Sequence, residues 1–393
     1  EVLIKYEFII SENQNEFDFL HNINESSINE NESLSYTIQP TSNCQLGCHY
    51  CGQKHSKHTM SDDISDKVLN RINKLYEMNK SRIKNLSITW YGGEPLMALH
   101  QIINLSKKLI ELSDRNKLSY NANIITNGLS LKEEIAKDLI DNCKINHFQI
   151  TIDTTKEFHD KRRITKSGFE TYDIIINNIV KLVNLKEFIN SNSSLLIRMN
   201  IDKVNQNGVV HFIDELNNLG LHNSKVSLNF APVTDWGSLK ANNGFTVEEF
   251  AIKEIDWCLY AIKKGFKFQS FLPERTTQSC MVVNKNSEVY DTFGNIYPCY
   301  EFPYTPKYTV DSYTIGNLKF DEKTFNDNAI TRNWFNDVKS ESVSHCKQCT
   351  FYPVCGGGCP KLWYEGTQAC PTFKFNIEDR LILEYLTNKT NIK

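Results

Sequence analysis

Three cysteines near the start of the chain have the type and spacing for metal chemistry. Cys44, Cys48 and Cys51 form a C-x-x-x-C-x-x-C pattern directly after a strand-like run. Three thiolates can hold three corners of a cubane iron–sulfur cluster, which leaves the fourth iron open. A closed structural site would use four protein ligands. The alternative is a zinc knuckle with His55 or His58 as fourth ligand, although neither histidine stands at a standard spacing.

A second motif, WYGGEP at 90–95, follows at the expected end of a second strand. Its two glycines, Gly92 and Gly93, allow the backbone to approach a ligand closely. The carboxylate of Glu94 can accept a hydrogen bond from an ammonium group. Taken alone, the same run also fits an ordinary turn.

Polar residues stand at or near the ends of three further strand-like runs. They are Asn127, Thr151, Asp153, Arg162, Arg163, Arg198 and Asn200. Residues two apart on a strand share one face, so Arg198 and Asn200 point the same way. The carboxyl ends of barrel strands gather on one face, which indicates a common ligand site. The alternatives are a simple turn at Asn127 and an ordinary polar edge for the Arg198 pair.

Seven further cysteines cluster in the last third of the chain: Cys280, Cys299, Cys346, Cys349, Cys355, Cys359 and Cys370. No secretory signal precedes the first motif, so tight spacing favours metal binding over disulfides. One or two zinc ribbons are the alternative. Cys143 and Cys258 stand alone in helix-like contexts and are expected to be core thiols.

The cysteine triplet and the WYGGEP run together resemble the signature of radical S-adenosylmethionine (SAM) enzymes. The resemblance implies a [4Fe–4S] cluster on the three cysteines, which would be the catalytic residues, with SAM on the open iron. A 5′-deoxyadenosyl radical would then abstract a substrate hydrogen. The expected SAM-site residues are Tyr50, Gly92, Gly93, Glu94, Asn127, Thr151, Asp153, Arg163, Arg198 and Asn200. Arg162 remains an alternative to Arg163, and Gly52 departs from the aromatic residue of many relatives.

The later cysteines resemble the SPASM domain of radical SAM enzymes that chiefly modify peptides. That resemblance implies two auxiliary [4Fe–4S] clusters, three clusters in all. By family connectivity the distal cluster uses Cys346, Cys349, Cys355 and Cys370. The proximal cluster would use Cys280, Cys299 and Cys359, and is one ligand short. An open iron, a substrate thiolate, or one of the side chains Glu274, Tyr300, Glu301 and His345 would complete it.

The hydrophobic pattern predicts an α/β fold, a partial (β/α)6 TIM-like barrel with a small C-terminal iron–sulfur domain. Strands are expected at 36–39, 86–90, 124–126, 148–152, 195–201 and 226–230. Helices are expected near 62–80, 98–114, 131–142, 169–187, 206–219 and 246–265. The predicted domains are a partly mobile segment 1–34 with a loop at 11–33, the barrel 35–265, a linker 266–279, the SPASM domain 280–375 and a helix 376–393.

Composition narrows the function classes. The net charge of −3 over 393 residues and the absence of a basic stripe argue against nucleic acid as a partner. No run of 18 apolar residues appears, which argues against a membrane span. Oxygen-sensitive clusters and SAM predict a reducing, low-oxygen cytoplasm.

The predicted activity is that of an oxidoreductase that acts on a ribosomally synthesised precursor peptide and installs a thioether, ether or C–C cross-link. The alternatives are an anaerobic sulfatase-maturating (formylglycine-forming) enzyme and a peptide epimerase. Sulfatase-maturating enzymes carry Asp at the position of Tyr300 and commonly Gln at that of Tyr91. The expected partners are the peptide and a flavodoxin or ferredoxin electron donor. Because only 43 residues precede Cys44, a separate leader-recognition or tailoring partner is also expected.

Overall fold

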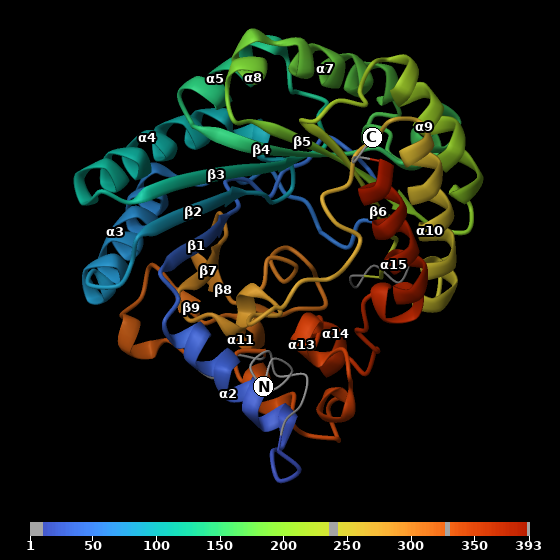
Figure 1. Ribbon diagram of the computed structural model, residues 1–393. Helices are drawn as coiled ribbons and strands as arrows, with labels where there is room; N and C mark the ends of the chain where they lie inside the picture. Colours follow the sequence, from blue (N-terminus) through green and yellow to red (C-terminus); the bar gives the residue numbers. More distant parts are fainter. Residues whose placement is uncertain (1–10, 236–242, 327–330, 391–393) are drawn as a thin grey trace.

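The computed structural model describes residues 11–235, 243–326 and 331–390 (Figure 1). The outermost parts of the predicted N-terminal segment and C-terminal helix, 1–10 and 391–393, lie outside the described residues. Helices line the outer side of a curved sheet, and the C-terminal third of the chain lies on its inner side.

Six parallel strands form the barrel sheet in the spatial order β6-β5-β4-β3-β2-β1. They are β1 Ser33–Ile38, β2 Asn85–Trp90, β3 Ser119–Thr126, β4 Ile145–Thr151, β5 Ser194–Ile201 and β6 Val226–Pro232. Each strand pairs with the next one in sequence, so all carboxyl ends reach the same edge. The predicted α/β partial barrel is confirmed, with each strand within a few residues of its expected place.

Each of the six expected helical stretches holds a helix. The principal ones are α3 Asp62–Asn79, α4 Leu99–Asn116, α5 Glu133–Asp141, α7 Tyr172–Asn184, α9 Val209–Asn218 and α10 Val247–Lys263. Shorter elements are η1 Pro95–Ala98, α6 Lys156–Arg162, α8 Lys186–Asn190 and η2 Gln206–Gly208. In α3 the Ser61 side chain caps the amino end, and Ile64, Val68 and Ile72 recur at four-residue spacing as the buried face.

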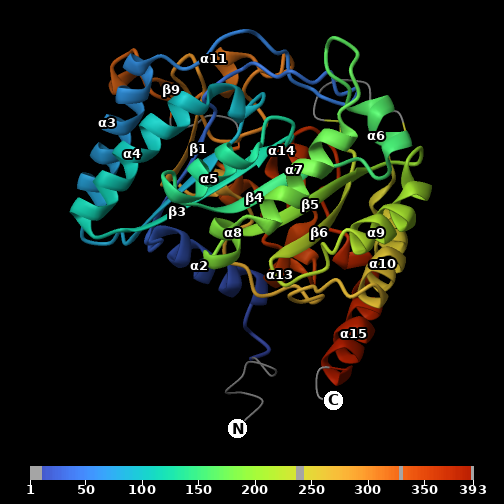
Figure 2. The ribbon, with the colours of Figure 1, turned by 90° about the horizontal axis from the view of Figure 1, so that it is seen from above.

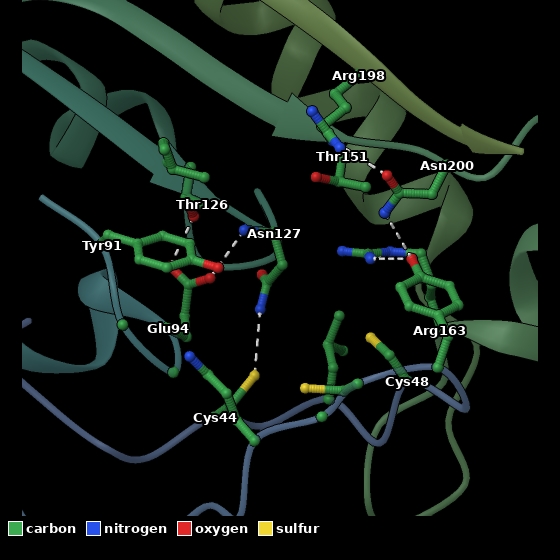
Figure 3. Close-up of a pocket in the computed structure, with 18 of the residues that line it drawn as sticks. Cys44, Cys48, Tyr91, Glu94, Thr126, Asn127, Thr151, Arg163, Arg198 and Asn200 are labelled. Atoms are coloured by element: carbon green, nitrogen blue, oxygen red, sulfur yellow. Dashed lines mark hydrogen bonds between the residues drawn. The ribbon is translucent and has the colours of Figure 1, made fainter. Parts of the chain in front are cut away.

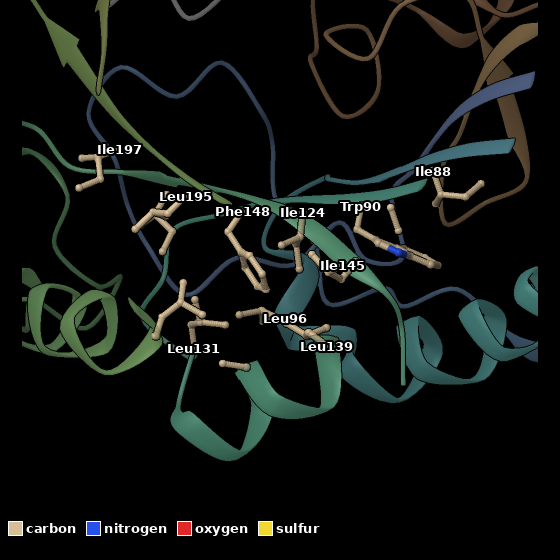
Figure 4. Packing of buried hydrophobic residues seen from close by; sticks show 14 of the residues in the cluster. Ile88, Trp90, Leu96, Ile124, Leu131, Leu139, Ile145, Phe148, Leu195 and Ile197 are labelled. Atoms are coloured by element: carbon tan, nitrogen blue, oxygen red, sulfur yellow. The ribbon is translucent and has the colours of Figure 1, made fainter. Parts of the chain in front are cut away.

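The main core lies between the strands and the outer helices. Ile124, Phe148 and Leu195 are fully buried and point from the sheet toward α5, where Leu139 lies (Figure 4). Burial alternates along β5, so that every second residue packs outward against helices. Arg198 therefore falls on the inner, concave side of the sheet, as its spacing from Asn200 predicts.

The C-terminal segment extends the same sheet. Strand β7 (Ser287–Tyr290) pairs in parallel with β1, and β8 (Asn295–Tyr297) and β9 (Gly316–Asn317) follow antiparallel. The remaining elements are η3 Met281–Val283, α11 Val310–Tyr313, η4 Glu322–Thr324, α12 Trp334–Asp337, η5 Cys346–Gln348, α13 Tyr352–Cys355, α14 Pro360–Tyr364 and α15 Phe373–Thr390. A second hydrophobic cluster, which includes Phe302 and Trp334, gives this segment a core that its short apolar runs did not predict.

The predicted loop over 11–33 is wrong, because most of this stretch is the helix α2 (Glu16–Asn29), capped by Asn15. Its few inward residues are enough to dock it. His21 is fully buried, stacks on Phe335 with ring centroids 3.9 Å apart, and shares a 3.0 Å hydrogen bond with the Tyr352 hydroxyl. A polar sequence hid this helix because two of its three buried residues are themselves polar.

Helix α15 packs beside α10 at the β6 side of the sheet (Figures 1 and 2). Arg380 forms an ion pair with Glu254 at 2.6 Å, and Asn376 donates to the Ala251 carbonyl at 2.8 Å. Non-helical backbone angles at Asn376 divide α15, so a short helical piece from Phe373 precedes the longer helix, which follows Asn376 close to the expected start at 376.

The buried His21 makes stability depend on pH. Burial lowers the pKa of His21 from 6.5 to about 4, so between these values the unfolded chain binds a proton that the folded chain rejects. Its contribution is complete above pH 6.5 and is lost as the pH falls toward 4. We expect His21→Phe to cost about 1 kcal/mol at pH 7 through the lost Tyr352 hydrogen bond, and less at pH 5.

Anaerobic urea unfolding at both pH values measures this difference. A gap between wild type and His21→Phe that widens as the pH falls would contradict the account.

Candidate active site

A pocket of about 310 Å³ opens at the carboxyl ends of the barrel strands. Its wall combines the cysteine loop, the glycine-rich turn after β2, polar residues from β3 to β5, and residues of the C-terminal segment (Figure 3). This volume lies at the lower end of the range for small-molecule sites. The edge of the sheet where the strands end therefore carries a ligand-sized cavity.

All three cysteines of the first motif line the pocket. Burial raises the pKa of Cys44 to about 12 and that of Cys48 to about 11. Thiolates in such a place need compensating positive charge, which bound iron supplies. The Asn127 amide lies 3.8 Å from the Cys44 sulfur and His55 Nε2 lies 3.9 Å from the Cys51 sulfur. Three soft donors on one wall fit an iron–sulfur cluster with one open iron.

No group of three or more His, Cys, Asp or Glu side chains converges on a single metal ion in the described part of the chain.

Two neighbouring backbones hold the cysteine loop in place. On one side Gly47 N donates to the Ile164 carbonyl at 2.9 Å and His49 N donates to the Arg162 carbonyl at 3.1 Å. On the other side Glu94 N donates to the Asn43 carbonyl at 2.7 Å. A Cβ at Gly93 would lie 2.3 Å from the oxygen of Asn43, so only glycine permits this approach.

The buried carboxylate of Glu94 joins the ends of β2 and β3. It accepts hydrogen bonds from Thr126 Oγ1 at 2.6 Å, Asn127 N at 2.8 Å and Leu96 N at 3.1 Å. Burial raises the pKa of Glu94, and the bonds from Thr126, Asn127 and Leu96 oppose that rise. A carboxylate offers about four acceptor positions, so one remains for a ligand's donor group.

On the opposite wall, strands β4 and β5 present Thr151, Arg198 and Asn200. Arg198 Nε donates to Asn200 Oδ1 at 3.0 Å, and a second guanidinium nitrogen lies 3.3 Å from Asn229 Oδ1. These neutral partners hold the arginine, whose positive charge acts on the Glu301 carboxylate of the same pocket wall. The pair can therefore meet an anionic or polar ligand group there.

The two arginines after β4 have different surroundings. Arg163 lines the pocket and donates to the Tyr50 hydroxyl at 2.6 Å. Arg162 instead bridges Asp153 at 3.0 Å and Asp202 at 2.8 Å, behind the wall. The geometry thus favours Arg163 over Arg162 as a ligand contact.

Of the predicted SAM-site residues, the structure brings all but Asp153 to this pocket. Those on its wall are Tyr50, Gly92, Gly93, Glu94, Asn127, Thr151, Arg163, Arg198 and Asn200. Asp153 is fully buried behind Tyr50, whose hydroxyl donates to it at 2.9 Å. Asp153 thus does not line the pocket, and its two oxygens accept hydrogen bonds from Tyr50 and Arg162.

Sequence reasoning did not place two aromatic residues and a carboxylate in this pocket. Tyr91 and Tyr300 pack edge to face with ring centroids 5.7 Å apart, and Glu301 lies beside them. Burial raises the pKa of Glu301 to about 7, and no other described residue forms a hydrogen bond with its carboxylate. Tyr91 belongs to the glycine-rich motif, so its place in the pocket could have been predicted from the sequence. The places of Tyr300 and Glu301 depend on the pairing of β7 with β1, which no local pattern reveals.

The structure places the later cysteines in two groups. One group lines a small cavity together with His345: Cys346, Cys349, Cys355 and Cys370. In the other, burial raises the pKa of Cys299, and the neighbouring Cys280, Glu301 and Cys359 raise it further.

The structure separates the four side chains considered as a missing ligand for the second group. His345 Nε2 lies 3.6 Å from the Cys370 sulfur, in the first group. Tyr300 and Glu301 line the main pocket and also lie near the second group, because the charge of Glu301 acts on Cys299 and Cys359 and that of Cys299 and Cys280 on Tyr300. Glu274 is exposed. Among the described residues no helix is long and apolar enough to cross a membrane.

Comparison with known proteins agrees with this geometry. The family model of the radical SAM superfamily matches residues 38–226. A cysteine-type anaerobic sulfatase-maturating enzyme of Clostridium novyi is 27% identical over 363 residues, 84% of this chain and 88% of that protein.

Two solved structures share the fold. The structure described as native anSMEcpe with bound AdoMet and Cp18Cys peptide has a TM-score of 0.66 at 19% identity, covering 90% of this chain and 99% of that one. Streptococcus suis SuiB bound to precursor peptide SuiA has a TM-score of 0.58 at 14% identity, covering 90% and 78%. The family match and the relatives thus identify this chain as an enzyme that contains a radical SAM domain at residues 38–226.

Proposed function

We propose that this enzyme abstracts a hydrogen atom from a ribosomally synthesised precursor peptide and installs a thioether, ether or C–C cross-link. The proposal rests on one observation, which is that two parts of the chain that each follow or contain cysteines line the same pocket. Tyr300 and Glu301, which directly follow Cys299, line the same pocket as the first cysteine triplet. A substrate in this pocket would thus meet both cysteine-bearing parts of the chain.

The proposed cofactors are SAM and three [4Fe–4S] clusters. Cys44, Cys48 and Cys51 would hold the first cluster, and the two later cysteine groups the others. When bound, this set supplies a 5′-deoxyadenosyl radical for hydrogen abstraction and auxiliary clusters that accept the second electron.

The residues of the pocket divide the remaining tasks. The free acceptor position of Glu94 and the charge of Arg163 suit the ammonium and carboxylate groups of SAM. Thr151, Arg198 and Asn200 suit its ribose or carboxylate, or a polar group of the substrate. The Tyr91–Tyr300 pair forms one side of the pocket, where a peptide side chain would lie beside Glu301.

The substrate class rests on the relatives. SuiB was solved with a precursor peptide, and anSMEcpe with a peptide and AdoMet. A flavodoxin or ferredoxin would deliver the electron, and a separate leader-recognition or tailoring partner would present the peptide. A reducing, low-oxygen cytoplasm suits such clusters.

Formylglycine formation is the second candidate, favoured by the match to the Clostridium novyi enzyme over 84% of this chain. Against it stand Tyr300 and Tyr91, at the two positions where sulfatase-maturating enzymes have Asp and commonly Gln. These departures contact each other in the pocket wall. Because Tyr91 and Tyr300 differ from the sulfatase-maturating enzymes at two positions that touch each other, we interpret the differences as an adaptation to another substrate and not as unrelated substitutions. Peptide epimerisation is the third candidate.

Removal of a first-triplet cysteine tests radical initiation. In Cys48→Ala the first cluster loses one of its three ligands, so 5′-deoxyadenosine formation from SAM under reducing conditions should fall to the level of protein-free buffer. Liquid chromatography of the reaction measures it. The matched control is Cys143→Ala, whose thiol is buried away from the pocket and should leave the rate unchanged. Retained 5′-deoxyadenosine formation in Cys48→Ala would sink the assignment.

Removal of a late cysteine separates initiation from product formation. Cys349→Ala should lose about four iron atoms per chain, one [4Fe–4S] unit, and keep SAM cleavage while peptide modification stops. Iron analysis and 5′-deoxyadenosine assays measure the two effects. An unchanged iron content would argue against an auxiliary cluster at this site.

Mass spectrometry separates the three candidate reactions. The probes are any short peptide encoded beside this gene and a peptide carrying the cysteine motif of a sulfatase. Cross-linking predicts the loss of two hydrogens from the first peptide and no change in the second. Exchange of sulfur for oxygen together with the loss of two hydrogens in the second peptide, which converts a cysteine side chain to an aldehyde, would establish formylglycine formation instead. Unchanged mass with deuterium uptake from heavy water would indicate epimerisation.

A further inference from the structure

The hydroxyl of Tyr50 is saturated with hydrogen bonds. Tyr50 lies between the second and third cysteines of the first motif. Its hydroxyl accepts from Arg163 at 2.6 Å and from Asn200 Nδ2 at 3.1 Å, and donates to Asp153 Oδ1 at 2.9 Å. A phenol has one donor and two acceptor positions, and all three are in use. One atom thus ties the cysteine loop to the ends of β4 and β5.

Behind this hydroxyl lies a buried charge network. The second oxygen of Asp153 accepts from Arg162 Nε at 3.0 Å, and Asp202 accepts from the same guanidinium at 2.8 Å. The Arg162 side chain is 6% exposed and those of Asp153 and Asp202 are 0% and 5% exposed. The guanidinium carbon also lies 5.3 Å from the centre of the Tyr50 ring. Buried charges of this kind are costly unless paired, and one guanidinium nitrogen of Arg162 still has no hydrogen-bond partner among the described residues.

The segment 153–163 that follows β4, the post-β4 turn, is also held together by the side chain of His159. Asp153 N donates to His159 Nδ1 at 3.2 Å, and His159 Nε2 lies 3.1 Å from Thr171 Oγ1. That hydroxyl donates to the Arg163 carbonyl at 2.6 Å. These hydrogen bonds link Asp153, the first residue of the post-β4 turn, to Arg163, its last residue, beside the pocket.

The turn stores backbone strain as well. Thr154 has a φ of +64° although its side chain is β-branched, and it is fully buried. Such conformations persist where surrounding contacts over-determine them, and they concentrate at functional sites. Here the surrounding contacts are those of Asp153 and His159 on either side.

We propose that Asp153 and Arg162 are positioning residues that hold Tyr50 and Arg163 in the geometry SAM requires. Neither side chain reaches the pocket wall. Their effect passes through the Tyr50 hydroxyl, which orients Arg163, whose Nε has no hydrogen-bond partner among the described residues. That buried nitrogen is the donor left for an anionic group of the ligand. The inference rests on the proposed SAM site.

A double-mutant cycle tests the proposal. Asp153→Asn keeps the shape of the side chain and removes its charge, and Tyr50→Phe removes only the hydroxyl. Each should weaken SAM binding about 10- to 100-fold, the loss expected for a hydrogen bond to a charged group. The Asp153→Asn/Tyr50→Phe double variant should be no weaker than the weaker single variant, because both act through one contact. Equilibrium dialysis with labelled SAM, on protein with full iron content, measures the dissociation constant.

Two further comparisons isolate a positioning role. The KM for SAM should rise more than the turnover at saturating SAM falls. Tyr260→Phe is the matched control, because it removes a 2.9 Å Tyr–Asp hydrogen bond to Asp214 on the outer surface and should leave SAM binding unchanged.

Each outcome bears on a separate claim. Unchanged SAM binding in Asp153→Asn, or additive losses in the double variant, would overturn the inference and leave the SAM site standing. If Asp153→Asn fails to assemble, unchanged binding in Tyr50→Phe alone overturns it. A wild-type protein that neither binds nor cleaves SAM would instead defeat the proposed function.

Discussion

The site depends on how closely two backbones approach each other at the end of the sheet. The turn after β2 presses Gly93 against Asn43, where a Cβ would lie 2.3 Å from the carbonyl oxygen. This contact fixes the loop that carries Cys44, Cys48 and Cys51 beside the end of β2. The antiparallel contact between Leu46 and Thr165 clamps the same loop from the β4 side. A cysteine loop held on both edges has little freedom to lose when it binds a cluster.

The charged side chains around the cysteine loop take their places because the loop is held on both edges. Backbone and hydroxyl donors at the end of the neighbouring strand occupy most acceptor positions of the Glu94 carboxylate. The guanidinium of Arg162 forms ion pairs with two aspartates. Arg163 and Arg198, in contrast, donate their hydrogen bonds to neutral oxygens, while Asp153 acts on Arg163 and Glu301 on Arg198 through charge alone. The C-terminal segment then closes the pocket with Tyr300 and Glu301, so that the barrel and the stretch directly after Cys299 form one cavity wall.

Local hydrophobic patterns in the sequence were sufficient to predict the barrel. Period-two burial in β5 placed Arg198 and Asn200 together, and the four-residue spacing of apolar residues placed helices such as α3. Long-range pairing decided what the patterns missed. Helix α2 is stabilised by His21 against Phe335, more than 300 residues away in sequence. Asp153 looked like a ligand contact because it follows a strand end, yet its oxygens are committed to neighbours that no sequence spacing shows.

The central claim is that the first cysteine triplet holds a cluster whose open iron accepts SAM. Electron paramagnetic resonance of the reduced, iron-reconstituted protein tests it most directly, in Cys346→Ala/Cys280→Ala, which removes a ligand from each later group. The account predicts a [4Fe–4S] signal whose g values shift when SAM is added. A signal that SAM leaves unchanged, or that survives further substitution of Cys44, Cys48 and Cys51 by Ala, would contradict it.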